Sequence, residues 1–289
     1  MLEFSIYKIA LTLGQSVKQL AVKLFRLHAK ELTSYEALEE AVKRGFKLKK
    51  STPRTFEISA GRNGVGTSYI LRKKSSDLLV FNQVILHHEY KTLIELVGKH
   101  SRTENIYWVV DAGANIGLTS LYLSDILREA RIVAVEPSAE NFKMLKENVS
   151  LNGRTRIIPI QNALWSERCN VKLSNAFRDR QEWSFRVSSD PSGLGDVEAL
   201  TLRDIMVKGG IESIDLLKID IEGAEKELLS DKSFLEELKS VKFLAIELHE
   251  EAVNKIQVVH QLESLGFDLI YKGETLFGVN LVALEKIRA

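Results

Sequence analysis

The chain contains 289 residues, of which 45% are hydrophobic, and its 40 basic and 39 acidic residues leave a formal net charge of +1. A chain of this length can bury one substantial core and a smaller appendage. The balanced charge excludes an overall field that would attract nucleic acid, although residues 43–50 and 72–74 are locally basic. We therefore expect a soluble globular protein without a nucleic-acid partner, and we interpret the basic runs as solvated surface.

The cysteine content and hydropathy indicate the cellular compartment. Cys169 is the only cysteine, so the chain can form neither an internal disulfide nor a cysteine-ligated zinc site. No apolar segment approaches the roughly 20 residues that span a bilayer. Lys8 and Lys18 interrupt the N-terminal apolar residues, where a secretory signal would be continuous. These features predict a cytoplasmic protein with no transmembrane segment.

Residues 1–50 predict a helical N-terminal appendage. Between Ile6 and Leu27 the apolar residues alternate spacings of three and four, as in a helix that packs against another helix. For residues 1–30, the body of the protein or a second copy is the favoured partner, and a membrane surface is the alternative. A second helix begins near Thr33, whose spacing to Glu36 is that of a capping box, and it ends near Gly45.

Residues 51–106 predict a connector that contributes a substrate-binding or lid segment. Pro53 and the glycines of residues 59–69 indicate loops and a short hairpin-like connection. Residues 75–97 begin with polar side chains and continue with a long apolar stripe of helical period.

Residues 107–289 predict an α/β domain. Buried strands are expected at 107–110, 131–137, 156–164, 214–223 and 241–249, with helices between them and a closing antiparallel pair at 267–273 and 276–286. Ligands of such sheets bind at the carboxyl ends of the strands. The insertion at 166–203 is polar and poorly periodic, with a mobile loop expected at 188–196, and it suits a substrate lid and a plain surface excursion equally.

The first strand-to-helix turn predicts a cofactor site. Asp111, Gly113 and Gly117 follow a short apolar strand and precede residues of helical spacing, so backbone N–H groups at a helix N-terminus could meet an anionic ligand. The order departs from G-x-G-x-x-G, which is evidence against a dinucleotide. Glu136 closes the next strand, where a carboxylate can accept both hydroxyls of a ribose. Its alternative role is a surface contact that caps the following helix.

Several separated motifs resemble the FkbM-type class I methyltransferases, which use S-adenosylmethionine. They read VVDAGANIGLTSLYL (109–123), VAVEPSAENF (133–142) and LLKIDIEGAEKELL (216–229), and SDLLVFNQVILHHEY (76–90) resembles the segment that precedes the cofactor domain in that family. The resemblance covers about residues 70 to 285. It implies a Rossmann-like sheet of seven strands whose last strand is inserted antiparallel. Arg203 departs from the family pattern, which often has an acid there.

The resemblance also implies roles for individual residues. Asp111 and the turn Gly113–Gly117, with Asn115 inside it, would hold the methionine moiety, and Glu136 would hold the ribose. Asn162 and Ala163 would lie near the adenine, and Asp220 would border both the cofactor and the acceptor. Asp77 and Tyr90 match positions of the family pattern and are expected to bind the acceptor substrate.

The strand ends carry candidate catalytic groups. Asp220 and Glu222 are two residues apart on one predicted strand, and Glu247 and His249 repeat that spacing on the next. Asp220 or His249 could be the general base for a hydroxyl. Alternatively, Asp220, Glu222 and His249 could ligate Mg²⁺ or Mn²⁺. In the third interpretation Glu222 and Glu225 only cap or pair around their turn, and Asp220 alone touches the site.

The expected function is that of an S-adenosylmethionine-dependent O-methyltransferase. The acceptor would be a hydroxyl of a small molecule, with a sugar or glycan favoured over a polyketide-like compound, and Mg²⁺ would be an optional second cofactor. The alternatives are an RNA or protein N-methyltransferase and a non-catalytic cofactor-binding module that assembles through its N-terminal helix. Balanced charge argues against the nucleic-acid version.

Overall fold

The structure is a computed structural model that describes residues 37–60, 66–174, 186–189, 195–221, 224–249 and 254–285. Two compact units divide the chain, the first ending at His88 and the second beginning at Glu89. The predicted heptad helix at residues 1–30 and the candidate ligand Glu222 lie outside the described residues.

The first unit contains a three-stranded antiparallel sheet. A helix at residues 37–43 ends at Gly45, whose φ of +93° and N–H bond to Val42 close the last turn as its sequence position predicted. The strands β1 (Lys47–Ser51), β2 (Thr55–Ser59) and β3 (Ser68–Arg72) follow in that spatial order. Strand β1 therefore begins inside the predicted helical appendage. Its lysine-rich sequence hid the alternation that marks a half-buried strand.

The apolar stripe of residues 75–97 is broken in the structure. The α-helix α4 (Asp77–Phe81) runs into the π-helix η2 (Asn82–Leu86), and α5 (Lys91–His100) starts anew in the second unit. Between them His88 takes a φ of +52°, which few residues other than glycine adopt, and this ends the helix. The buried ring of Phe81 meets Phe46 and Tyr69 edge to face, each with a ring-centroid distance of 5.3 Å, in the core of the first unit.

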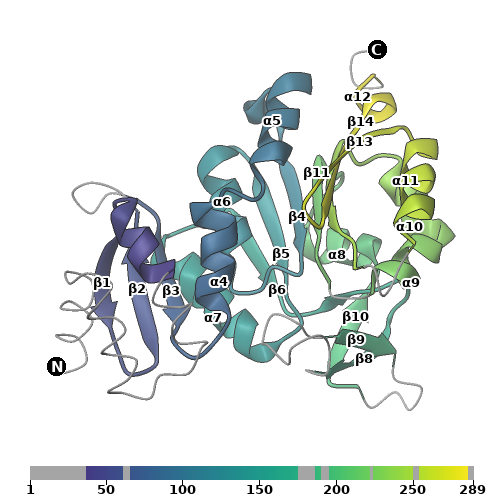
Figure 1. Cartoon of the computed structure of the whole chain (residues 1–289). Helices are drawn as coiled ribbons and strands as arrows, with labels where there is room; N and C mark the ends of the chain where they lie inside the picture. The colour runs from purple at the N-terminus through teal and green to yellow at the C-terminus, as the bar shows by residue number, and fades with distance from the viewer. Residues whose placement is uncertain are drawn as a thin grey trace. The chain divides into compact units, whose positions relative to one another are not determined.

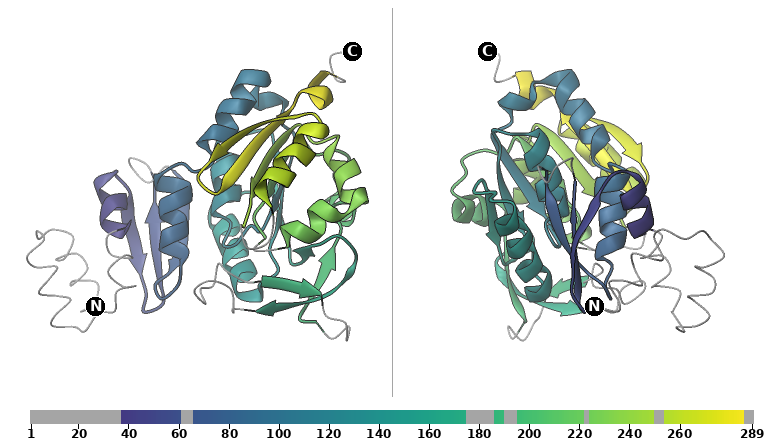
Figure 2. Two further views of the ribbon diagram at one scale, coloured as in Figure 1. Left: turned by 45° about the vertical axis from the view of Figure 1, so that its right-hand side comes forward. Right: turned by 90° about the vertical axis from the view of Figure 1, so that its left-hand side faces the viewer.

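The second unit is built on a mixed sheet of seven strands in the order β13-β14-β12-β11-β4-β5-β6. Five strands are parallel: β4 (Trp108–Ala112), β5 (Arg131–Val135), β6 (Ile157–Ile160), β11 (Leu216–Ile219) and β12 (Phe243–Glu247). Strand β14 (Thr275–Asn280) lies between β12 and β13 (Phe267–Lys272) and is antiparallel to both, as Figure 2 shows in yellow. This arrangement confirms the predicted seven-stranded methyltransferase sheet with its antiparallel last strand.

Helices cover both faces of this sheet. Helices α5, α6 (Leu118–Ile126) and α7 (Ala139–Leu151) lie on one face, and α8 (Leu202–Gly209), α10 (Lys232–Leu238) and α11 (Lys255–Ser264) lie on the other (Figure 1). The described residues of this unit also form three short helices: η3 (Thr103–Asn105), α9 (Glu225–Ser230) and α12 (Leu281–Glu285). Because both faces are covered, most residues of the central parallel strands are buried, which explains why these strands are mainly apolar.

The insertion after β6 is more regular than its sequence indicated. Strands β7 (Ala163–Leu164), β8 (Cys169–Ser174), β9 (Arg186–Ser189) and β10 (Val197–Leu200) form a second sheet in the order β7-β10-β8-β9. Helix α8 then starts with a capping box between Thr201 and Asp204, the acid beside Arg203. The strands β8, β9 and β10 are short and contain polar residues, so no apolar run in the sequence marked them. A lid role for the insertion stays a prediction.

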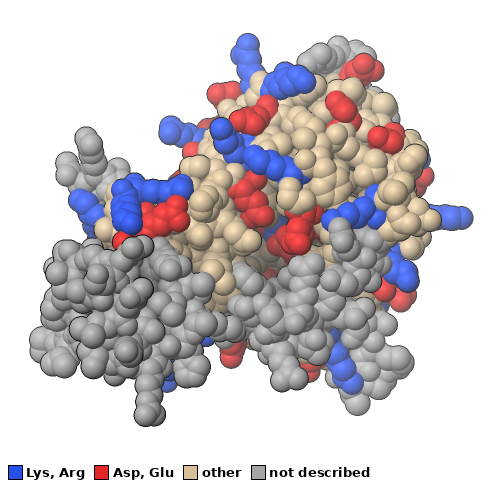
Figure 3. Space-filling model, in the orientation of Figure 1, with Lys and Arg blue, Asp and Glu red and all other residues tan. Residues whose placement is uncertain are grey.

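The surface of the described residues carries both signs of charge. Lysine and arginine side chains are interspersed with acidic ones on the face in Figure 3, in agreement with the balanced composition. Among the described residues, no helix has the length and apolar character needed to cross a bilayer.

The turn after β4 is packed too closely for any side chain at Gly113. A Cβ atom built there would lie 1.7 Å from the backbone carbonyl oxygen of Asp220, and Gly113 has a φ of +76°. Gly117, with a φ of +86°, would place its Cβ 2.5 Å from Leu145 of α7. The sequence suggested that these glycines admit a ligand, but the structure shows that they let the turn pack against the end of β11 and against α7.

We expect Gly113→Ala to prevent folding or to cost more than about 4 kcal/mol of unfolding free energy, because the overlap is with backbone that cannot rotate away. Gly153→Ala is the matched control, since Gly153 also has a positive φ but has no atom within 4 Å of the added Cβ. The control should lose only about 1–2 kcal/mol for its backbone conformation. Urea unfolding of both variants measures the difference, and equal losses would contradict the packing argument.

Candidate active site

Ionisable side chains gather where neighbouring parallel strands end. Asp111 lies near the end of β4, Glu136 directly follows β5, and Asp220 directly follows β11. Glu247 is the last residue of β12, and His249 lies two residues beyond it. Because β5, β4, β11 and β12 are consecutive parallel strands, these residues share one edge of the sheet, where α/β proteins bind ligands.

The turn after β4 is held by its own backbone. The N–H groups of Gly113 and Ala114 both donate to the carbonyl of Val135, at 3.0 and 2.9 Å, and Asn115 N–H donates to Glu136 Oε2 at 2.8 Å. Asn115 also takes a φ of +51°, a conformation that asparagine tolerates better than most residues. These N–H groups of the turn are therefore already bonded, which differs from the expectation that the turn leaves them free.

The start of α6 provides donors instead. No side chain in the described part of the chain caps this helix, and the Leu121 N–H bond to the Gly117 carbonyl, at 3.0 Å, begins its ladder of hydrogen bonds. The N–H groups of residues 118–120 consequently have no acceptor within the helix. Together with the positive end of the helix dipole, they suit a carboxylate.

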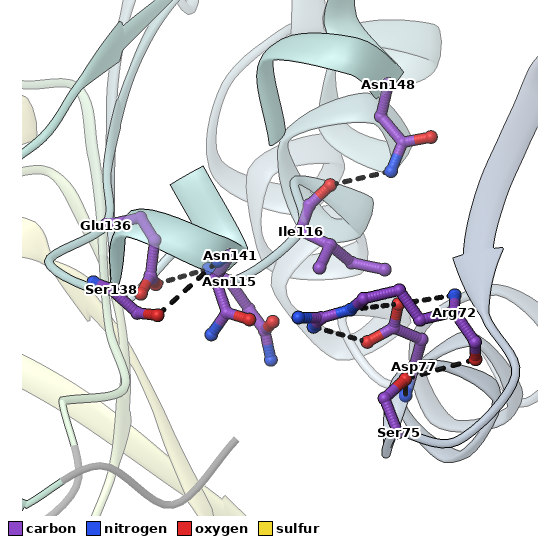
Figure 4. A network of polar contacts seen from close by, with 9 residues as sticks. All are labelled: Arg72, Ser75, Asp77, Asn115, Ile116, Glu136, Ser138, Asn141 and Asn148. Carbon is purple, nitrogen blue, oxygen red and sulfur yellow. Dashed lines mark hydrogen bonds and ion pairs between the residues drawn. The ribbon is translucent and has the colours of Figure 1, made fainter. Parts of the chain in front are cut away.

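Glu136, at the end of β5, joins the turn after β4 to the start of α7. Its carboxylate accepts the N–H of Asn115 and, at 2.9 Å, the N–H of Ser138 that caps α7 (Figure 4). Burial, which leaves 5% of the residue exposed, raises its pKa to about 7 despite these bonds. The side chain of Asn141 also bonds this carboxylate, which leaves one of the roughly four acceptor positions of Glu136 open. The contact near the helix start is thus present, and the ribose role stays a prediction compatible with it.

Lys218 is a buried cation that sequence reasoning missed. Its Nζ lies 3.2 Å from Asp111 Oδ1 and 3.4 Å from Asp220 Oδ2, and it donates to the Gly113 carbonyl at 2.7 Å. Burial alone would lower its pKa, but the charges of Asp111 and Asp220 hold the pKa well above its usual value. The sequence did contain a signal for this buried ion group. Lys218 lies within an otherwise apolar strand, and a lysine is almost never buried unless it is paired.

Asp111 is engaged entirely inside the protein. It has no exposed surface, and its Oδ2 accepts the hydroxyl of Ser120 at 2.6 Å while Oδ1 faces Lys218. The structure therefore shows Asp111 fixing the turn and Lys218. Direct contact with the cofactor's methionine moiety stays a prediction.

His249 is oriented by an acid from α9. His249 Nδ1 lies 2.7 Å from Glu225 Oε1, and the two residues are 1% and 0% exposed. His249 Nε2 lies 3.7 Å from Glu247 Oε1. Asp220, Glu247 and His249 each offer a ligand atom within 4.8 Å of the others, and we call these three residues the strand-end cluster. The cluster brings two predicted catalytic residues together, and Glu225 has a histidine partner that its sequence position did not reveal.

Tyr90 belongs to the same region. It is 3% exposed, and its ring meets Phe277 of β14 edge to face with a centroid distance of 6.5 Å. Burial raises the pKa of its hydroxyl well above the usual value, and the nearby charges of Glu89 and Asp220 add to the rise. Glu89, which the sequence did not single out, has a raised pKa through burial and the charge of Asp220. Tyr90 and Glu89 therefore lie close enough to the strand ends for the charge of Asp220 to act on both.

Three other predicted residues make internal contacts. Asp77, in the first unit, is 1% exposed and accepts Arg72 Nε and Nη2 at 3.0 and 2.8 Å, which ties β3 to α4. Asn162 donates to the Glu198 carbonyl at 2.9 Å and accepts Lys208 Nζ at 2.6 Å. Ala163 begins β7. A substrate role for Asp77 and an adenine role for Asn162 and Ala163 stay predictions.

Comparison with known proteins gives the family. Residues 111–269 match the family model described as "Methyltransferase FkbM domain". The chain belongs to this family. It is therefore an S-adenosylmethionine-dependent methyltransferase, and the matched segment begins at Asp111 and contains the whole strand-end cluster.

Individual relatives are distant. The chain is 29% identical over 194 residues to "Methyltransferase sdnD" of Sordaria araneosa, covering 56% of this chain and 74% of that protein. It is 23% identical over 201 residues to "2-O-methyltransferase NoeI" of Sinorhizobium fredii (strain NBRC 101917 / NGR234), covering 65% of this chain and 76% of that protein. Among solved structures it is similar to the METTL16 MTase domain, with a TM-score of 0.45, 12% identity and coverage of 86% of this chain and 78% of that chain.

The raised pKa of Glu136 predicts a pH-dependent effect of Glu136→Gln. The folded pKa of about 7 exceeds the usual 4.5, so the stability linked to the protonated carboxyl is complete below pH 4.5 and is lost as pH rises through 7. Glutamine cannot ionise and avoids that loss. Between about pH 5 and pH 8 the unfolding free energy of the variant should gain roughly 2–3 kcal/mol relative to the parent. Urea unfolding at both pH values measures it. Glu140→Gln, at an exposed position, serves as control. If the stability difference between Glu136→Gln and the parent is the same at pH 5 and pH 8, the raised pKa of Glu136 is contradicted.

Lys218→Met should destabilise the protein by about 3–5 kcal/mol, because it leaves the buried Asp111 carboxylate without its cation. The double variant Asp111→Asn with Lys218→Met should recover much of this loss, because no uncompensated charge then remains at Asp111. Urea unfolding of the single and double variants measures the coupling. Equal stabilities would show that the pair is not the source of the loss.

Proposed function

We propose that this methyltransferase transfers the methyl group to a hydroxyl oxygen of a small molecule, with a sugar or glycan as the favoured acceptor. The observation that carries the proposal is the strand-end cluster, in which a histidine fixed by Glu225 stands beside two carboxylates. A hydroxyl must lose its proton to become a strong nucleophile, and these groups are of the kind that assists this loss. The relative named as a 2-O-methyltransferase supports the oxygen acceptor.

The described residues fit the cofactor. S-adenosylmethionine supplies a methyl group on a positively charged sulfonium, together with an ammonium, a carboxylate and a ribose. Glu136 keeps acceptor capacity for the ribose hydroxyls, and the uncapped start of α6 suits the carboxylate. Asp220 and Glu247 place negative charge at the same edge, where Lys218 is already shared between two carboxylates. This edge can therefore accept the positive charge of the cofactor.

The protein's own contribution is mainly positioning and removal of the proton. The acceptor oxygen gives up its proton and gains the methyl group, and the sulfonium is left as a neutral thioether. Such a displacement needs little covalent help, so orientation and exclusion of water should supply most of the rate enhancement. The charge of Asp220 acts on both Tyr90 and Glu89, so these two residues lie near the strand-end cluster. We expect them to contact the acceptor, in addition to the predicted role of Asp77.

The first experiment is a calorimetric titration of the metal-stripped protein with S-adenosylmethionine. Glu136→Ala should weaken binding by about 1–3 kcal/mol, the usual scale for hydrogen bonds to a charged group. Glu140→Ala, an exposed acid in the first turn of α7, is the matched control and should bind normally. Normal affinity in Glu136→Ala would remove the ribose assignment.

Acceptor screening then tests the oxygen chemistry. Radiolabelled methyl transfer to hydroxylated sugars, polyketide-like alcohols, peptides and RNA should label only the hydroxyl compounds. Transfer to a peptide or RNA nitrogen would replace the proposed acceptor class. Cofactor binding without transfer to any of these compounds would favour a non-catalytic module.

A further inference from the structure

The strand-end cluster has the composition and spacing of a cation site. Asp220 and Glu247 come from neighbouring parallel strands, and His249 follows the second strand. Their ligand atoms lie within 4.8 Å of one another. Ligands about 2.0–2.4 Å from one cation lie roughly 3–4.5 Å apart, so small rotations of two partly exposed carboxylates would close the set.

The independent observation is the orientation of His249. Histidines that bind metals usually give their other ring nitrogen to a carboxylate, which fixes the tautomer and the direction of the ring. Here Nδ1 is paired with the fully buried Glu225, and Nε2 is the nitrogen on the side of Glu247. An acidic patch alone would not include a buried imidazole held in this way.

The surrounding charges favour an added cation. Lys218 is the ammonium beside Asp220, and it is shared with Asp111 and the Gly113 carbonyl. The carboxylate oxygens that Asp220 and Glu247 offer lie within 4.8 Å of each other. A second positive charge between Asp220 and Glu247 would relieve repulsion that one lysine leaves in place.

We infer that Asp220, Glu247 and His249 bind one divalent cation of the Mn²⁺ type, which in turn binds two adjacent oxygens of the acceptor. The inference rests on the proposed hydroxyl methylation. Carboxylates suit Mg²⁺ and Mn²⁺, whereas imidazole suits later transition metals such as iron and zinc. Because this site combines two carboxylates with one imidazole, we choose Mn²⁺ as the probe. Three protein ligands leave about three positions of an octahedron open. Two neighbouring hydroxyl oxygens can fill two of these positions, which makes the substrate class a vicinal diol.

Coordination gives the reaction its proton step. Binding to a divalent cation lowers the pKa of a hydroxyl. The O–H bond of the bound hydroxyl breaks and its proton passes to water, the new O–CH₃ bond forms, and the S–CH₃ bond of the cofactor breaks to leave a thioether. His249 is then a ligand of the cation and does not act as the base.

The test is a titration of the full, metal-stripped chain with Mn²⁺, in which electron paramagnetic resonance counts the free ion. We expect one saturable site. Glu247→Gln should weaken it at least tenfold, whereas Glu263→Gln, which removes an exposed acid on α11, should leave it unchanged. Glu225→Gln should weaken it tenfold to a hundredfold through His249. Because Glu247 is half-buried, its variant should fold and can test the site even if variants of the buried His249 do not fold.

A second experiment tests the vicinal-diol substrate class with catechol and phenol as matched probes. Catechol should lower the water-proton relaxation caused by protein-bound Mn²⁺ because it displaces coordinated water, and phenol at equal concentration should do so much less. Equal effects of the two compounds would overturn the diol assignment.

Other outcomes overturn the cation site and leave the methyltransferase proposal standing. No saturable Mn²⁺ binding by the folded parent, or equal binding by Glu247→Gln, removes the site. S-adenosylmethionine binding together with full turnover in excess chelator then assigns the proton to the His249–Glu225 pair. If transfer to hydroxyls fails while Mn²⁺ still binds, the proposed function fails and the cation site does not.

Discussion

The buried ammonium of Lys218 is the interaction on which the ligand edge of the sheet depends. It joins the carboxylates that end β4 and β11, and it also holds the Gly113 carbonyl at the start of the glycine turn. A charge at 2% exposure is tolerated only with partners on several sides. Because Gly113 approaches the Asp220 backbone so closely, the strand spacing, the turn and the ion group form one unit, and none of them can change alone.

Much of the second unit was predictable because its strands are short, apolar and buried on both faces. Such strands stand out between helices of period 3.6. Elements with weaker patterns were not predictable. Lysines hid β1, and the strands β8, β9 and β10 are too short and too polar to give an apolar pattern. The helix break at His88 depends on one unusual backbone conformation, and no residue type in the sequence demanded it.

The sequence marked residues that the structure brings to one edge of the sheet, but it could not show how these residues pair. The motifs marked Asp111, Glu136, Asp220 and His249 because strand ends meet at one edge. They could not show that Glu225 holds His249 or that Lys218 spans two strands, since these contacts join residues 24 and 105 to 107 positions apart. The same holds for Asp77, which matched a family pattern: the pattern could not show that its carboxylate binds Arg72 in the described contacts.

Charge balance links the cofactor to the proposed cation. Lys218 offsets part of the negative charge of Asp111 and Asp220, and Glu247 adds a carboxylate within 4.8 Å of Asp220. A sulfonium cofactor brings positive charge to this edge during each cycle and leaves as a neutral thioether. After methyl transfer that positive charge is gone from the edge. A divalent ion resident at the strand-end cluster would be the positive charge that stays beside Asp220 and Glu247 throughout the cycle.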